Sequence, residues 1–256
     1  ISFDIKEGEI FGFLGPSGAG KTTTINILTG QLSQDSGKAY ILNKESNRLL
    51  PSDFLNIGIM SDTVGFYGKM TVYKNLQFFA KYHNVSLDKL DVLLKELELF
   101  EDKDKKAEKL STGMKQRMLL IRSILHHPKI LFLDEPTSGL DPALSNKVHD
   151  ILLNLKNEGT TIFLTTHDMS EATKICDRIS LLNSGHILEY GSPQEIIDKY
   201  SQQDKAVIRF KNGDSIMVSQ AEAARYLGGS DVASVHTLEN TLEDIFIKIS
   251  EDSKNA

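Results

Sequence analysis

The 256-residue sequence has one cysteine, Cys176, and no excess of basic residues. A single cysteine cannot form an internal disulfide, and no metal-ligand spacing surrounds it. The composition therefore fits a reducing compartment and predicts a small buried thiol. The formal net charge is -6, so no sequence-wide positive field favours nucleic acid as a partner.

Long apolar runs are also missing. The longest, such as 130–133, have the length of a strand, whereas a membrane-spanning helix needs about 20 apolar residues. We therefore expect no transmembrane helix in this chain, while attachment to a membrane surface stays open. The sequence starts at Ile1 rather than Met, inside a strand-like run, and we expect a further segment upstream of it.

Short apolar runs separated by turn residues are frequent in the first 200 residues. They are Ile1–Ile5, Ile10–Leu14, Lys38–Leu42, Ile57–Met60, Lys129–Leu133, Thr160–Thr165 and Arg178–Leu182. Helical segments are expected to begin near Asp141 and Asp168. Strands that alternate with helices predict an α/β fold with a mostly parallel sheet.

The middle of the chain has helical spacing instead. Val72, Leu76 and Ala80 recur on one helix face, and similar spacing continues to about His127. We predict one α/β domain over 1–200, with a core formed by 1–61 and 128–200 and an all-helical insert at 62–127.

A polar stretch after Lys199 predicts a linker into a small α+β C-terminal extension, 201–256. The runs 206–210 and 215–218 are strand-like. A last helix is expected from Thr241 to Ser250, with Asn240 and Glu243 as its capping pair.

The strongest motif is a glycine-rich loop between an apolar run and a helix. It reads Gly15, Pro16, Ser17, Gly18, Ala19, Gly20, Lys21, Thr22 and Thr23. In this context the order is typical of a phosphate-binding P-loop, whose backbone N–H groups surround an anion at the positive end of a helix. Lys21 is expected to reach the β and γ phosphates, and Thr22 to bind Mg²⁺. The alternative is a simple glycine-rich turn.

Two acids and a histidine follow later apolar runs. Ligands of open α/β sheets bind at the carboxyl ends of strands, so Asp134 is predicted to contact Mg²⁺ and Glu135 to act as general base on the attacking water. His167 is placed to donate to the γ phosphate. Taken alone, the acids would be a solvated turn and the histidine a surface or capping residue, but the phosphate loop favours a site.

A second loop contains Ser111, Thr112 and Gly113 ahead of a helix. By itself Ser111 is an ordinary helix N-cap. Together with the phosphate loop, the stretch 134–141 and His167, this loop resembles the signature loop of ABC ATPases. That combination and order of motifs is specific to the family, and the resemblance covers roughly residues 1–198.

The resemblance implies a P-loop NTPase core that binds ATP with Mg²⁺ and hydrolyses the ATP. In ABC ATPases the signature loop faces the γ phosphate held by the other subunit. Ser111 and Gly113 would then bind the nucleotide of a second cassette, either a copy of this chain or a close paralogue, and Asp141 would lie in the loop that communicates across the interface. The expected role is to power integral membrane transporter subunits at the cytoplasmic face of the cell membrane.

Two features resemble the branch of multidrug, antibiotic-resistance and sodium exporters. The signature reads Ser-Thr-Gly-Met rather than Ser-Gly-Gly-Gln, and the stretch 241–246 is similar to tails in that branch. Both favour export. The aromatic residue that stacks on adenine in this family is expected upstream of Ile1, so it has no position in this chain.

Two other functions compete with transport. A non-transport ABC ATPase that acts on ribosomes or DNA usually has two cassettes in one chain or long coiled-coil arms, and this sequence has neither. A GTPase or small-molecule kinase is disfavoured because Asn43 and Lys44 lack the aspartate of a guanine-reading motif. The sequence does not name the cargo, which the membrane subunit selects.

Asp62 is the position where the sequence departs most from ABC relatives. Those relatives have a glutamine that links the Mg²⁺ site to the membrane partner. An aspartate offers a charged oxygen, which a hard cation prefers. The alternatives are a role in coupling to the membrane partner alone or an exposed turn residue.

We predict that Asp62 belongs to the Mg²⁺ shell when nucleotide is bound. Asp62→Asn should then raise the Mg²⁺ concentration needed for half-maximal ATP hydrolysis, because an amide attracts the cation less than a carboxylate does. A Mg²⁺ titration of ATPase activity, wild type against variant, measures the difference. Superimposable curves would leave only a coupling or turn role.

Overall fold

Most of the apolar runs form one six-stranded sheet in the computed structural model, which describes residues 1–61, 65–200, 205–237 and 240–252. The strand order is β4-β5-β6-β1-β7-β8. The bounds are β1 (Ile10–Leu14), β4 (Ile57–Met60), β5 (Ile130–Asp134), β6 (Thr161–Thr166), β7 (Arg178–Asn183) and β8 (His186–Gly191). From β4 to β7 every neighbouring pair is parallel, which confirms the predicted fold class.

The two central strands, β1 and β6, are buried along their whole length. A parallel sheet covered on both faces needs apolar side chains throughout, which explains the continuous apolar runs in the sequence. Phe11, Phe132 and Phe163 belong to this core. The strand predicted at Ile1–Ile5 is wrong. These residues form no strand, and Phe3 instead stacks on Phe11 with 5.6 Å between ring centroids.

Three helices connect strands of the sheet: α1 (Lys21–Leu28), α5 (Pro142–Asn157) and α6 (Met169–Ile175). The predicted starts of the last two are confirmed. The carboxylates of Asp141 and Asp168 each accept hydrogen bonds from two backbone amides of the helix that follows. These caps fix where both helices begin.

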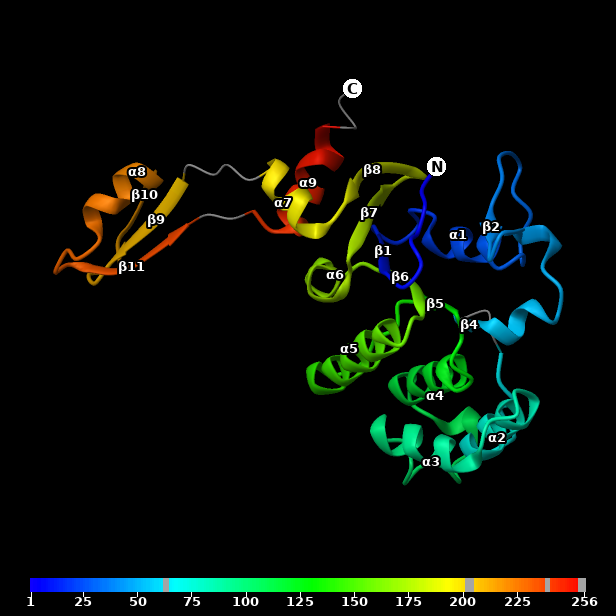
Figure 1. Cartoon of the computed structure of the whole chain (residues 1–256). Helices are drawn as coiled ribbons and strands as arrows, with labels where there is room; N and C mark the ends of the chain where they lie inside the picture. Colours follow the sequence, from blue (N-terminus) through cyan, green and yellow to red (C-terminus); the bar gives the residue numbers. More distant parts are fainter. Residues whose placement is uncertain (62–64, 201–204, 238–239, 253–256) are drawn as a thin grey trace. The chain divides into compact units, whose positions relative to one another are not determined.

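The helical insert contains α2 (Val72–Tyr82), α3 (Leu87–Glu96) and α4 (Thr112–Ile124), which lie together near β4 and β5 (Figure 1). Gly58 of β4 permits a close approach of α4. A Cβ atom at this position would lie 2.2 Å from the carbonyl oxygen of Ser123. The absence of a side chain therefore sets the distance between the insert and the sheet.

The chain divides into two compact units, and the first comprises Ile1–Leu188. Several short elements complete this unit. They are the hairpin β2 (Tyr40–Ile41) and β3 (Lys44–Glu45), and the 3₁₀ turns η1 (Ser46–Arg48), η2 (Asp53–Asn56) and η3 (Ala107–Lys109). The predicted burial of Cys176 is confirmed, and burial raises the pKa of its thiol.

A second compact unit comprises Glu189–Ala256, and the sequence-based division at residue 200 stays a prediction. A three-stranded antiparallel sheet has the order β10-β9-β11. The elements are α7 (Pro193–Tyr200), β9 (Lys205–Phe210), β10 (Ser215–Ser219), α8 (Gln220–Ala223), η4 (Ala224–Tyr226), β11 (Val232–Thr237) and α9 (Leu242–Asp252). Strand β11 was not predicted, because its sequence mixes small and polar residues.

The cap of α9 differs from the prediction. Thr241 and Asp244 form the reciprocal pair, in which the Thr241 hydroxyl accepts from the Asp244 amide at 3.2 Å. The Thr241 amide donates to the Asp244 carboxylate at 3.0 Å. Asn240 instead donates to the carbonyl oxygen of Tyr200 at 2.9 Å. In the described part of the chain, no helix combines the length and the apolar character needed to cross a membrane.

Candidate nucleotide site

The predicted site residues follow three neighbouring strands of the sheet. The order β5-β6-β1 and the parallel register align Asp134 with Thr165, and Leu14 with Thr166. The phosphate loop after β1, the acids at the end of β5 and the histidine after β6 therefore lie at the same edge of the sheet. The chain brings Thr22 and Asp134 together across 112 residues of sequence.

Three glycines of the phosphate loop lie where a side chain would clash with a neighbour or strain the backbone. A Cβ atom on Gly15 would lie 2.2 Å from the carbonyl oxygen of Leu182. Gly18 and Gly20 have φ values of 82° and 110°, a left-handed conformation that glycine adopts without strain. Each of these three positions therefore disfavours a side chain.

The start of α1 suits an anion. Gly20 is the N-cap residue and has no side chain, so the first amide groups of α1 have no side-chain cap in the described structure. Such amides, together with the helix dipole, form a phosphate-binding site. Pro16, Ser17 and Thr23 are exposed around this helix end, whereas Ala19 is buried.

Lys21 crosses the phosphate loop. Its buried Nζ donates to the carbonyl oxygen of Gly15 at 2.6 Å and lies 3.4 Å from that of Pro16. The same ammonium is 3.3 Å from Oε1 of Glu135. A positive charge is thus held between the loop and one of the two predicted acids.

Asp134 binds two threonine hydroxyls. Thr22 Oγ1 donates to Oδ2 at 2.8 Å, and Thr165 Oγ1 donates to Oδ1. The hydroxyl and carboxylate oxygens of Thr22 and Asp134 are the type of ligand that Mg²⁺ takes together with nucleotide phosphates. The donor set therefore fits this cation.

Glu135 has a left-handed backbone with φ 52°, which is unusual and strained for a residue with a side chain. Its amide donates to the carbonyl oxygen of Thr165 at 3.0 Å, and its carbonyl accepts from Gln116 Nε2 at 2.8 Å. Its Oε2 lies 2.7 Å from Nδ1 of His167. The carboxylate is thereby held between Lys21 and His167.

The signature loop caps a helix, as predicted. Ser111 Oγ accepts from the amide of Met114 at 3.3 Å at the start of α4. A Cβ atom on Gly113 would lie 3.0 Å from the carbonyl oxygen of Gly139, so this loop packs against the stretch that precedes Asp141. Among the described residues, no hydrogen bond or ion pair joins Ser111 or Gly113 to the phosphate loop of the same chain.

Two neighbours of the acids were missed from the sequence, and one predicted ligand cannot be placed. Thr165 is aligned with Asp134 only because β5 and β6 are adjacent, and Gln116 reaches Glu135 from α4. A threonine at the end of an apolar run was a weak signal, and the strand order needed to use it was unknown. Asp62 lies outside the described residues.

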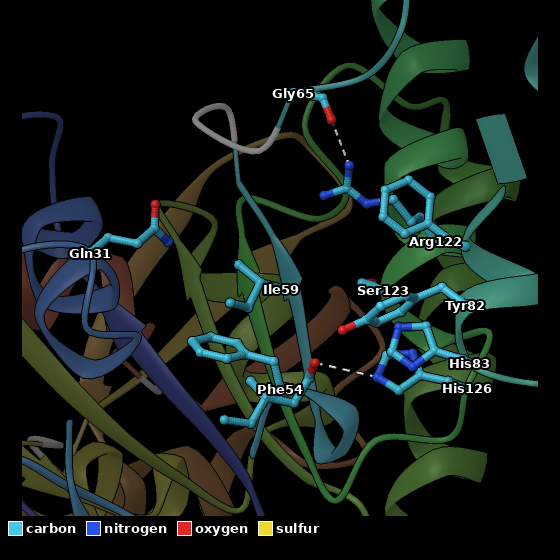
Figure 2. A pocket seen from close by; sticks show the side chains of 11 residues that line it. Gln31, Phe54, Ile59, Gly65, Tyr82, His83, Arg122, Ser123 and His126 are labelled. Carbon is cyan, nitrogen blue, oxygen red and sulfur yellow. Dashed lines mark hydrogen bonds between the residues drawn. The ribbon is translucent and has the colours of Figure 1, made fainter. Parts of the chain in front are cut away.

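A hollow that we call the insert groove lies beside β4, away from the phosphate loop (Figure 2). Its volume is about 470 Å³. Figure 2 shows Tyr82, His83 and His126 along one wall and Phe54 and Ile59 along the other. The full lining is Gln31, Phe54, Ile57, Ile59, Gly65, Phe79, Tyr82, His83, Arg122, Ser123 and His126.

The insert groove is apolar with a single cation among its described lining residues. Arg122 donates to the carbonyl oxygen of Gly65 at 2.7 Å, and its guanidinium lies 4.8 Å from the ring centroid of Phe79. Burial lowers the pKa of Arg122 to about 10, so it stays charged at neutral pH. Burial and the neighbouring His83 lower the pKa of His126 to about 4, and burial also lowers the pKa of His83. Both imidazoles are therefore mainly neutral at pH 7.

The fold and the nucleotide site together define a P-loop ATP-binding domain with a helical insert. The sequence profile of the ABC transporter family matches residues 1–138. The fluoroquinolones export ATP-binding protein of Mycobacterium tuberculosis is 37% identical over 262 residues, covering 98% of this chain and 86% of that protein. The Nod factor export ATP-binding protein I of Bradyrhizobium diazoefficiens is 32% identical over 277 residues, covering 98% and 90%.

A solved ATP-binding subunit of an ABC transporter shares the fold, with a TM-score of 0.74 and 22% identity over 97% of this chain and 90% of that one. An ATP-binding cassette of an ABC transporter in its ADP conformation has a TM-score of 0.63 and 26% identity, covering 76% and 84%. The chain belongs to the ABC transporter family, as one of its ATP-binding domains, and is an ATPase.

Proposed function

We propose that this chain drives export through separate membrane subunits, from the cytoplasmic face of the cell membrane. The observation that carries the proposal is the Lys21–Glu135–His167 cluster beside the phosphate loop, which suits hydrolysis of a bound nucleotide. Several similar proteins are named for export, including those for fluoroquinolones and Nod factor. These names favour transport over the alternative of an ABC ATPase that acts on ribosomes or DNA.

The residues of the site take separate roles in this proposal. The amides of the phosphate loop and Lys21 bind the phosphates of ATP, and Thr22 and Asp134 hold Mg²⁺. When bound, Mg²⁺ neutralises part of the phosphate charge. Glu135 accepts a proton from the attacking water, while His167 orients Glu135 and the γ phosphate. The 2.7 Å contact between these two side chains supports their joint role.

Replacing Glu135 with glutamine tests the general base. Glu135→Gln keeps the shape but removes the proton acceptor, so ATP hydrolysis should fall by about 10²-fold or more while ATP still binds. Lys21→Ala should instead weaken nucleotide binding. Steady-state ATPase assays and nucleotide titrations measure both, with Glu96→Gln on α3 as a control that keeps full activity. Near-normal turnover in Glu135→Gln would remove Glu135 from this role.

We also propose that two chains assemble head to tail around ATP. Ser111 is exposed at the N-terminus of the 13-residue helix α4 and makes no described contact with its own phosphate loop. The positive end of that helix is suited to the γ phosphate held by a second copy or a close paralogue. Gly113 lets this loop pack against Gly139, because a Cβ atom at position 113 would lie 3.0 Å from the Gly139 carbonyl oxygen.

An added charge at the helix cap tests this assembly. Ser111→Asp keeps a good N-cap residue but places a carboxylate where the γ phosphate would bind, so ATP-driven dimers should be lost. Ser86→Asp makes the same change at the N-cap of α3 and should have no effect. Light scattering of each variant in the Glu135→Gln background, with Mg-ATP and with Mg-ADP, measures the dimer fraction. Equal dimerisation of both variants would contradict the arrangement.

The insert groove is the proposed contact for the membrane subunit. It lies beside β4, and in ABC relatives the segment after the corresponding strand links the Mg²⁺ site to the membrane partner. The aromatic walls and the charged Arg122 are complementary to a partner element that presents apolar side chains and a carboxylate. The neutral imidazoles of His83 and His126 permit apolar contacts at neutral pH.

Matched tyrosine substitutions test the insert groove. Tyr82 and Tyr40 are both 56% exposed, but only Tyr82 lines the groove. Tyr82→Ala should weaken binding of the membrane subunit that co-purifies with the wild type by about tenfold, as expected for loss of an interface aromatic, and Tyr40→Ala should not. Binding in detergent and ATPase activity of the isolated chain are measured together. Equal affinities with unchanged ATPase activity would reject the groove as the contact.

A further inference from the structure

A buried carboxylate lies next to the segments that carry the hydrolytic residues. Glu171 of α6 is 4% exposed. Its Oε1 accepts hydrogen bonds from Thr137 Oγ1 at 2.8 Å and from His149 Nε2 at 2.9 Å. Thr137 is two residues after Glu135, and Glu171 is four residues after His167. One oxygen atom of Glu171 therefore connects the loop that contains Glu135 to α6, the helix that follows His167.

His149 connects a third element to this oxygen. It lies on α5 and is 6% exposed. A carboxylate accepts but does not donate, so both Thr137 and His149 act as donors to Glu171. Within the described residues, Glu171 Oε2 and His149 Nδ1 have no hydrogen-bond partner. A buried acid is costly unless it is hydrogen-bonded, so both donors matter for keeping it in place.

The backbone of Glu135 explains why such an anchor is needed. Its left-handed conformation, with φ 52°, persists only where neighbouring contacts enforce it. Thr165 holds its amide and Gln116 holds its carbonyl oxygen. The bond from Thr137 to Glu171 fixes the chain on the C-terminal side of the strained residue.

We propose that Glu171 is a positioning residue for ATP hydrolysis. By binding Thr137, it keeps the loop of Glu135 aligned with the segment that carries His167, so that the two side chains stay 2.7 Å apart. His149 holds Glu171 in the orientation that reaches Thr137. This inference rests on the proposed roles of Glu135 and His167.

A valine at position 137 tests the proposal. Thr137→Val removes the hydroxyl at nearly constant volume, so kcat should fall by about tenfold as the base loses its alignment. The KM for ATP should change by less than about twofold, because the phosphate loop is untouched. Thr137→Ser restores the hydroxyl and should recover most of kcat.

Thr160 provides a matched control for lost stability. Its hydroxyl donates to the carbonyl oxygen of Pro128 at 2.9 Å, and Thr160 is 4% exposed, whereas Thr137 is half-buried. It precedes β6, about 20 Å along the strand from the end that carries His167. Thr160→Val should lower the thermal unfolding temperature by an amount similar to Thr137→Val while kcat stays unchanged. Equal losses of kcat in both valine variants, or no recovery with serine, would overturn the proposal.

A double substitution isolates the contribution of Glu171. In a Glu171→Leu background, the further change Thr137→Val should lower kcat by less than about twofold, because its partner is already absent. A full tenfold loss in that background would show that Thr137 acts without Glu171. If Glu171→Leu fails to fold, the valine and serine variants at position 137 still test whether the Thr137 hydroxyl is needed to position Glu135.

The Glu135→Gln assay separates this inference from the proposed function. An active Glu135→Gln protein would reject the assignment of the base, whatever the behaviour of Thr137. An inactive Glu135→Gln protein together with a fully active Thr137→Val protein would reject only the positioning role of Glu171.

Discussion

One carboxylate, that of Asp134, accepts hydrogen bonds from two threonines that come from different elements, α1 and β6. Thr22 follows β1, and Thr165 belongs to β6. Because β5, β6 and β1 are parallel neighbours in register, these groups reach the same edge of the sheet. The residues beside them in sequence, Lys21 and Glu135, are thereby brought within 3.3 Å of each other. The geometry of the nucleotide site thus depends on the strand order.

Sequence alone predicted the parts of the site whose residues are contiguous. The phosphate loop, Asp134, Glu135 and His167 each follow an apolar run, and that local context is the basis of their prediction. Contacts between distant segments were not predictable, because they depend on which strands pair. Thr165 and Gln116 belong to this second kind. The strand predicted at 1–5 fails because Phe3 packs on the core residue Phe11 instead. The cap of α9 was misplaced by one residue, because Asn240 and Thr241 are both residue types that cap helices.

The nucleotide site and the insert groove share a strand pair but differ in chemistry. β4 borders the groove and pairs with β5, which ends at Asp134. The site contains the cation of Lys21 and the carboxylates of Asp134 and Glu135, whereas the groove has aromatic walls and the cation of Arg122. A charged set of residues and an apolar groove therefore border the same pair of strands.

The pairing of β1 has a consequence for synthesis of the chain. Both partners of β1 are distant in sequence, since β6 begins at Thr161 and β7 at Arg178. At translation rates of about 5–20 residues per second, roughly 8–30 s pass between the synthesis of β1 and the synthesis of β6. During that interval the strand has unpaired edges and exposed apolar side chains, so the nascent chain is open to aggregation and to chaperone binding. His167 follows β6 directly, so the residues of the proposed nucleotide site also come together only after that interval.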